Sequence, residues 1–207
     1  MDKLTSWSIL NLMTVDTSLA FDPETALEAA MHAFWSDGYE ACSMQRLLQA
    51  TGLPESSIYQ TFGGRHALFT RCLLLYQKRS VARMTNLLEE APSGMTFLRN
   101  VMSGVLNDRI DNEVPRGCFM MNTASELGQT DPGIAKVVND SLTRFRGVFQ
   151  EAVEQAQREG DIPAERDAAE LAAYLVTCMG GLRTMVKAGA DDKLVKSTVE
   201  IMLGALP

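Results

Sequence analysis

The chain has 207 residues, of which 46% are hydrophobic and 22% are charged. These values fit a globular protein with one large domain or two small ones, and they exclude a globally disordered or fibrous chain. The formal charge of −7 disfavours a protein that coats nucleic acid indiscriminately, but it allows a small basic surface on an acidic body.

The four cysteines are scattered, without a CxxC pair and without histidine at metal-ligand spacing. This pattern predicts free thiols in a reducing cytoplasm, and neither a metal nor a cofactor is expected. The most apolar stretch beyond the N-terminal region, residues 171–182, is shorter than the ~20 residues that cross a bilayer. We therefore expect a cytoplasmic protein without a membrane partner.

Hydrophobic residues recur at helical spacing and no long stretch alternates with period two, which predicts an all-α protein. Capping and breaking residues divide the chain into about nine helices. Their expected ranges are about 23–37, 44–50, 54–62, 65–90, 95–110, 118–127, 131–159, 166–187 and 191–206. The first three are too short to be stable alone, so they are expected to share one core. Its predicted members are Leu27, Ala30, Phe34, Leu47, Leu48, Leu53, Ile58 and Phe62.

The second and third helices are joined at Thr51-Gly52-Leu53, with the spacing of a helix-turn-helix, in which glycine permits the sharp bend. Residues 43–79 carry five basic side chains against the single acid Glu55, a local charge of +4, whereas residues 81–207 carry −5. The five are Arg46, Arg65, Arg71, Lys78 and Arg79. Because a DNA backbone attracts such a basic segment, the helix-turn-helix is predicted to bind DNA.

Residues 21–76 combine several short motifs in a fixed order. They are an Ala/Leu-rich first helix, a Phe-Trp…Gly-Tyr-Glu link, a Ser-Met-x-x-Leu second helix, a Thr-Gly-Leu turn, a Ser-x-Tyr-x-x-Phe-Gly third helix and an Ala-Leu-Phe start of a fourth. This combination resembles the N-terminal domain of TetR-type (TetR/AcrR) transcriptional regulators. Weaker similarity continues through PRGCFMMNTASELG and a Leu-Ala-Ala…Gly-Gly-Leu-Arg helix. The resemblance implies an N-terminal arm (1–20), a helix-turn-helix domain (21–66) and a larger helical domain for ligand binding and dimerisation (67–207).

The resemblance also implies that the third helix enters the major groove of a palindromic, double-stranded DNA operator. The expected DNA-binding residues are Arg46, Ser56, Ser57, Tyr59, Gln60, Thr61 and Arg65. Serine and glutamine can hydrogen-bond to base edges, while Tyr59 and Arg65 are suited to phosphate.

The helix expected at 166–187 is apolar nearly all round, so it must be covered on two sides. A second subunit is the natural cover, and Gly180-Gly181 would let helices approach closely; a buried central helix in a monomer is the alternative. The resemblance implies a homodimer through the last two helices and a repressor that a small-molecule inducer releases from DNA. Candidate ligand-binding residues, which would equally suit an ordinary apolar core, are Phe97, Cys118, Met121, Phe145, Phe149, Tyr174 and Met179.

Two further functions stay open. Cys118 follows Arg116-Gly117 at an expected helix N-terminus, where the helix dipole and a cation favour a reactive thiolate, so the regulator would respond to electrophiles or redox state. Glu55 and the acidic arm suggest instead a helical interaction module without DNA binding. No HExxH, GxSxG or GxGxxG motif occurs, and we expect no enzymatic activity.

Overall fold

The computed structural model describes residues 21–109 and 115–207, so the predictions for the arm and for Ile110 lie outside the described residues. Within these ranges the all-α prediction is confirmed: nine α-helices and one 3-10 helix are present, and no strand. The elements are α1 (Pro23–Asp37), α2 (Met44–Thr51), α3 (Glu55–Phe62), α4 (Arg65–Glu89), α5 (Gly94–Ser103), η1 (Gly104–Arg109), α6 (Phe119–Leu127), α7 (Pro132–Glu159), α8 (Ala168–Lys187) and α9 (Asp192–Gly204).

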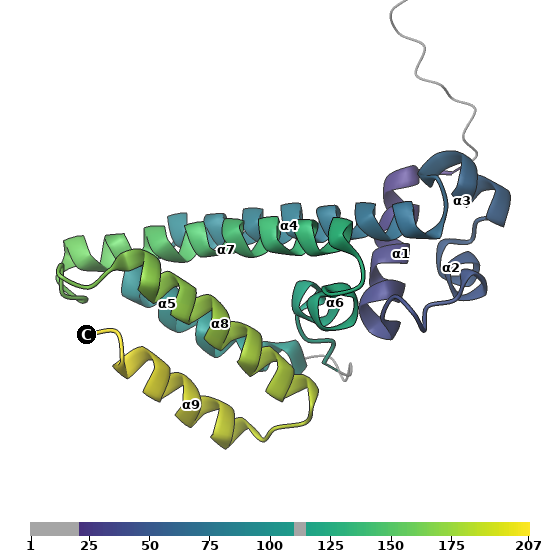
Figure 1. Cartoon of the computed structure of the whole chain (residues 1–207). Coiled ribbons are helices and arrows are strands. Elements are labelled where there is room, and N and C mark those ends of the chain that lie inside the picture. Colours follow the sequence, from purple (N-terminus) through teal and green to yellow (C-terminus); the bar gives the residue numbers. More distant parts are fainter. Residues whose placement is uncertain (1–20, 110–114) are drawn as a thin grey trace, which may run out of the picture.

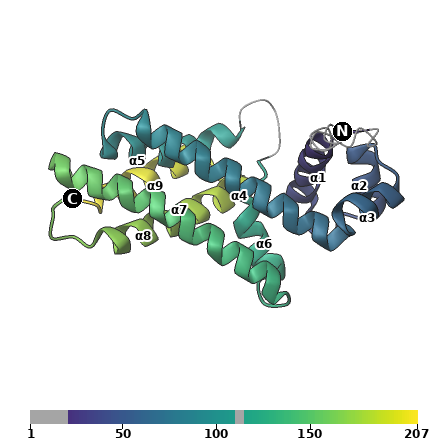
Figure 2. The same ribbon diagram turned by 90° about the horizontal axis from the view of Figure 1, so that it is seen from above.

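The first three helices form a small unit at one end of the molecule (Figure 1). Helix α4 leaves this unit and runs beside α7, which starts near the same end (Figures 1 and 2). Helices α5 and α8 cover the other side of this long pair, α9 packs against α5 and α8, and α6 lies at the junction with α1. A small unit is thus joined to a larger helical body through α4 and α6.

Local chemistry sets the ends of α1. The Asp22 carboxylate accepts the N–H groups of Glu24 and Thr25, each at 3.1 Å, and Gly38 ends the helix with φ of +84°. Six of the eight predicted core residues are buried, namely Ala30, Phe34, Leu47, Leu53, Ile58 and Phe62. Leu27 and Leu48 lie partly buried at the edge of the same cluster. The cluster also takes in Phe119 from α6 and Ile134 from α7, which the sequence did not indicate.

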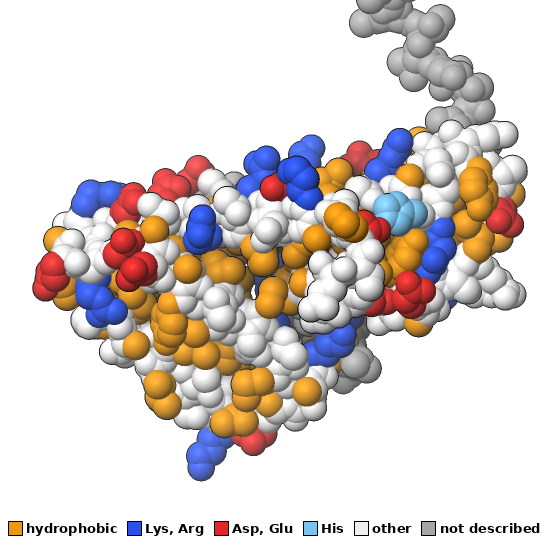
Figure 3. All heavy atoms as spheres, in the orientation of Figure 1, with side chains coloured by type: hydrophobic (Ala, Val, Ile, Leu, Met, Phe, Trp, Pro, Cys, Tyr) orange, Lys and Arg blue, Asp and Glu red, His pale blue; other side chains and the backbone are white. Residues whose placement is uncertain are grey.

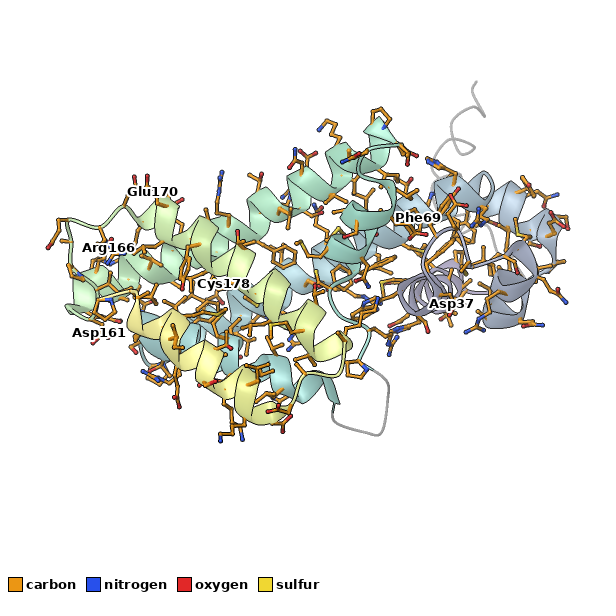
Figure 4. All side chains as sticks on the ribbon, turned by 60° about the horizontal axis from the view of Figure 1, so that its bottom comes forward. Asp37, Phe69, Asp161, Arg166, Glu170 and Cys178 are labelled. Carbon is orange, nitrogen blue, oxygen red and sulfur yellow. The ribbon has the colours of Figure 1, made fainter. Side chains whose placement is uncertain are left out.

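Two predicted helices are corrected by the structure. The single helix expected at 95–110 is wrong beyond Ser103, where the chain tightens into η1 at Gly104, a residue of low helix propensity. Helix α8 begins at Ala168 rather than Arg166 because the Asp167 carboxylate accepts the N–H groups of its first turn. Arg166 instead donates to three carbonyl oxygens at the end of α9, those of Ala205, Leu206 and Pro207, each at 3.3 Å (Figure 4).

The core of the body depends on one close approach between α5 and α7. A Cβ at Gly94 would lie 2.3 Å from the carbonyl oxygen of Ala152, so only glycine fits there. The Gly94 N–H also donates to the Glu159 carboxylate at 2.9 Å. Within the described part of the chain, no helix is long and apolar enough to cross a membrane.

Candidate DNA-binding surface and ligand cavity

The turn between α2 and α3 has helix-turn-helix geometry. Gly52 takes the left-handed conformation with φ of +69°. The Thr51 hydroxyl donates to the Leu47 carbonyl at 2.8 Å and accepts the Leu53 N–H at 3.3 Å. These bonds fix the angle at which α3 leaves α2, and the helix-turn-helix prediction is confirmed.

Helix α3 is anchored on one side and exposed on the other. Ile58 and Phe62 are buried in the shared core. On the opposite side lie four exposed side chains, which we call the recognition face: Glu55, Ser56, Tyr59 and Gln60. Ser57 and Thr61 flank it and are half-buried. The structure therefore brings five of the seven predicted DNA-binding residues, Ser56, Ser57, Tyr59, Gln60 and Thr61, to one short surface.

Tyr59 is 55% exposed, but its ring is held from behind. A Cβ at Gly64 would lie 3.0 Å from Cε1 of that ring, and Gly64 has φ of +102°. Glycine at this position therefore leaves room for the tyrosine to stand at the edge of the recognition face. No hydrogen bond of its hydroxyl group occurs within the described residues, so the group faces solvent.

The remaining two predicted residues are engaged by the protein itself. The exposed Arg46 donates from Nε to the Asp37 carboxylate at 3.0 Å. Arg65 is half-buried, with its guanidinium carbon 4.1 Å from the centre of the Tyr39 ring, and it donates to the carbonyl oxygens of Tyr39 and Cys42, the latter at 3.0 Å. Its side chain thus holds the turn between α1 and α2, a contact across more than twenty residues that the motif does not reveal.

The charge of +4 counted over residues 43–79 is reduced by acids from α1. Asp37 pairs with Arg46, and Glu28 pairs with Arg79. Arg71 has a different function that the sequence did not indicate: it donates to the carbonyl of Thr61 at 3.3 Å, at the C-terminal end of α3. The basic surface is therefore smaller than the sequence count suggests.

Helix α6 connects the small unit to the body. The Glu126 carboxylate accepts the backbone N–H groups of Tyr39 at 2.9 Å and Glu40 at 2.7 Å, so it holds the turn after α1. At the other end of α6, the Trp35 indole donates to the Gly117 carbonyl at 3.1 Å. Sequence reasoning missed Glu126, because nothing in the order of residues reveals that an acid on α6 faces a turn 87 residues away.

Aromatic rings and a charged pair reinforce this junction. Phe119 of α6 packs against Phe69 of α4 with ring centres 5.8 Å apart, and Figure 4 shows Phe69 beside α6. His66 Nε2 lies 2.7 Å from the Asp131 carboxylate at the start of α7. The Asp131 carboxyl has a lowered pKa because it accepts the Ile134 N–H and contacts His66. Both α6 and α7 thus contact the first turns of α4, next to the small unit.

A cavity of about 390 Å³ lies within the body, in the range of small-molecule sites. The five α-helices from α4 to α8 and the 3-10 helix η1 contribute to its walls. Five of the seven predicted ligand-binding residues line it: Phe97, Cys118, Met121, Phe145 and Met179. Polar side chains that sequence reasoning missed also line it, among them Arg83, Asn100 and Arg183. They lie on different helices, and only packing brings them together.

Phe149 and Tyr174 are corrections to the predicted cavity. Phe149 is fully buried, and its ring packs 6.1 Å from that of Phe97, so it belongs to the core behind the wall. The Tyr174 hydroxyl donates to the Met202 carbonyl of α9 at 3.4 Å, which directs the ring to the outside of α8. When a helix is apolar on all sides, its sequence does not predict which of its residues face a cavity.

The cysteines differ in exposure. Cys42 and Cys72 are buried, and burial raises the pKa of the Cys42 thiol to about 11 and that of Cys72 still further. Cys118 is half-buried at the N-cap of α6, with Sγ 3.9 Å from the Tyr76 hydroxyl, and it lines the cavity. Cys178 is also half-buried. In the described residues, no three His, Cys, Asp or Glu side chains form a metal-binding group.

The outer faces of α8 and α9 carry exposed hydrophobic side chains, which on α9 lie among charged residues such as Lys193, Lys196 and Glu200. Tyr174, Leu194 and Ile201 are 36%, 45% and 74% exposed, and Figure 3 shows hydrophobic side chains over both helices. Gly181 is exposed with open space around it, whereas a Cβ at Gly180 would lie 3.0 Å from Cε of Met121. The close approach predicted at Gly180 is therefore made to α6 of the same chain.

Comparison with known proteins identifies the family. Residues 26–72 match the family model for bacterial regulatory proteins of the tetR family, and residues 94–202, just over half of the chain, match the tetracyclin repressor-like C-terminal domain. The chain belongs to the TetR family. It is a DNA-binding transcriptional regulator with an N-terminal helix-turn-helix, as predicted, and the alternative of a helical module without DNA binding is not supported.

Relatives of this TetR-family chain span almost its whole length. The HTH-type transcriptional repressor ComR of Escherichia coli is 30% identical over 178 residues, which is 85% of either chain. The uncharacterized regulator YezE of Bacillus subtilis is 27% identical and covers 90% of this chain and 96% of its own. A cysteine mutant of the TetR-family regulator CifR, solved with 26-bp operator DNA, is 27% identical with a TM-score of 0.78, covering 91% of this chain and 98% of its own.

Proposed function

We propose that this regulator is a homodimeric repressor that leaves a palindromic operator when a small molecule occupies the cavity. Residues 21–66 form the DNA-binding unit, and residues 67–207 bind the ligand and dimerise. The recognition face enters the major groove, with Tyr59 at phosphate and Gln60 at a base edge. Arg65 acts by holding the α1–α2 turn, and the N-terminus of α4 attracts phosphate. It acts in the cytoplasm and catalyses no reaction.

The position of α6 carries this proposal. Cys118 and Met121, near the start of α6, line the cavity, while Glu126, near its end, holds the backbone of the DNA-binding unit. A ligand that favours a shifted α6 therefore also favours a shifted recognition face. Coupling through a single helix explains how a ligand in the cavity would change the affinity for DNA.

The outer faces of α8 and α9 support the homodimer. From residue 171 to residue 182, α8 carries no charged side chain, although Thr177 and Gly181 on its outer side are exposed. An uncharged exposed stripe next to Leu194 and Ile201 has the composition of an interface core. Two copies related by a two-fold axis would present two recognition faces to the half-sites of a palindrome.

Fluorescence anisotropy with DNA from the region flanking the gene tests the repressor. We expect sequence-selective binding that weakens steeply with salt. A thermal-shift screen then finds compounds that stabilise the protein, and these should release the DNA. Replacing Met179, in the wall of the cavity, by tryptophan should abolish the response and leave DNA binding intact. Compounds that bind equally well to this variant would place the ligand site elsewhere.

A second function is favoured by Cys118, which lines the cavity at the N-cap of α6. We infer that its covalent modification would move α6 in the same way as a bound ligand. The related regulator CifR was solved with operator DNA as a mutant of its cysteines. Maleimide labelling of the native protein, followed by mass spectrometry, should modify Cys118 before the buried Cys42 and Cys72. An unreactive Cys118, or a modified protein with unchanged operator affinity, would contradict this function.

A further inference from the structure

Glu55 is the one charged side chain on the recognition face. It is exposed in the first turn of α3, one helical turn before Tyr59 and on the same side. Within the described residues it forms no ion pair or hydrogen bond through its carboxylate, although Arg46 and Arg71 stand on neighbouring helices. A surface that approaches DNA phosphates thus presents an unneutralised negative charge.

Such a carboxylate costs affinity on most DNA sequences. It accepts hydrogen bonds and donates none, and it is repelled by phosphate oxygens and by the acceptors N7 and O6 of guanine and O4 of thymine. Adenine has an amino group in the major groove, but its N7 acceptor lies next to it. Cytosine differs, because its edge in the major groove offers the N4 amino group as a donor.

We propose that Glu55 is a specificity-determining residue that selects a cytosine in each operator half-site through a hydrogen bond from N4–H to its carboxylate. This rests on the proposed entry of the recognition face into the major groove. Selectivity arises from attraction to one base and repulsion by the others, so the residue lowers affinity for unrelated DNA as well. The small basic surface gives little affinity for DNA in general, and Glu55 lowers the affinity for unrelated DNA further. Discrimination between the operator and other DNA is therefore increased.

Selection of half-sites from a randomised DNA library, followed by anisotropy on single variants, tests this proposal. With the wild type, we expect one position at which replacing cytosine weakens binding by about tenfold. Glu55→Gln has nearly the same shape without the charge, and glutamine suits adenine, so the preference should move from cytosine towards adenine. Its affinity for unrelated DNA should rise several-fold.

Two further variants distinguish base recognition by Glu55 from the general effect of its negative charge. Glu55→Asp keeps the charge but shortens the reach, so it should lose the cytosine preference while unrelated DNA stays weakly bound. Glu89→Gln, at the far end of α4, makes the same charge change away from α3 and should alter neither property. Circular dichroism on each variant confirms that the helices remain.

The results distinguish this proposal from the proposed function. A wild type that selects no site would overturn both. A wild type that selects a palindrome without a Glu55-dependent cytosine would overturn only the specificity function. Equal strengthening of binding to all sequences in Glu55→Gln would show that the carboxylate repels phosphate and reads no base, which also overturns the proposal.

Discussion

In the small unit, every side chain proposed to read DNA bases lies within the eight residues of α3. The cavity, in contrast, takes its walls from five α-helices and η1, and from residues as far apart as Ser80 and Arg183. The small unit is built from short helices that need caps, a left-handed glycine and a fixed core. The body is built from long helices with interchangeable apolar side chains. The small unit therefore carries many recognisable sequence motifs, whereas the body carries few.

The largest effect is expected at the proposed dimer interface. Gly181→Arg places a charged side chain on the uncharged stripe of α8, where two copies would meet. Sedimentation should show a monomer, and operator affinity should fall by at least about a hundredfold, because each copy then binds one half-site alone. Glu151→Gln makes the same charge change on the exposed side of α7 and should have no effect. A dimeric Gly181→Arg protein with normal affinity would place the interface elsewhere.

Phe34→Ala tests how strongly the short helices depend on their common core. Phe34 is fully buried, with its ring centre 4.9 Å from that of Phe69. We expect the free energy of unfolding in urea to fall by about 3–5 kcal/mol. Leu74→Ala, at a side chain that is 46% exposed, is the control and should change it by less than about 1 kcal/mol. Similar losses for both variants would contradict the dependence of the short helices on this buried ring.

Glu126→Gln tests the link between the two regions. An amide retains one acceptor oxygen, but its NH₂ group faces the second backbone N–H, so the contact should lose about 1–3 kcal/mol. We expect operator affinity to fall by up to about tenfold while the dimer remains intact, because the α1–α2 turn is held less firmly. If operator affinity and the ligand response both stay normal, α6 does not carry the coupling.

Two substitutions on the recognition face should have smaller and different effects. Tyr59→Phe removes one hydroxyl and should weaken binding to all DNA sequences by roughly fivefold. Gln60→Ala should leave binding to unrelated DNA unchanged and flatten the preference at one base pair. Competition experiments with single-base operator variants distinguish the two effects. If Gln60→Ala keeps the wild-type preference, base readout is wrongly assigned to Gln60.

The smallest effect is expected at Asp131, which is half-buried. Its lowered pKa means that the folded state favours the charged carboxylate, so this stabilisation is present above the ordinary pKa and is lost as pH falls through the lowered value. Asp131→Asn should therefore lower Tm slightly at pH 7, and the two proteins should converge below about pH 4. Thermal unfolding across this pH range measures it. A difference that grows in acid would contradict the sign.

Much of the architecture could be predicted, because caps and breakers act on adjacent residues. Asp22 and Ser43 cap α1 and α2 with their own side chains, and Gly52 ends α2 in the left-handed conformation. The prediction of a single helix at 95–110 was wrong, because a switch to 3-10 geometry at Gly104 leaves the hydrophobic spacing almost unchanged. Phe149 and Tyr174 were misplaced because helical periodicity separates buried from exposed positions but does not distinguish a core from a cavity wall.

The sequence by itself determined the helical class, the helix-turn-helix and the family, because these depend on local spacing that any fold of this chain must respect. The tertiary structure alone decided that Arg65 holds a turn, that Asp37 and Glu28 neutralise part of the basic segment, and that Glu126 joins the body to the DNA-binding unit. The physical reason is distance along the chain. These side chains pair with groups that can lie tens of residues away, and such groups come together only when the core packs.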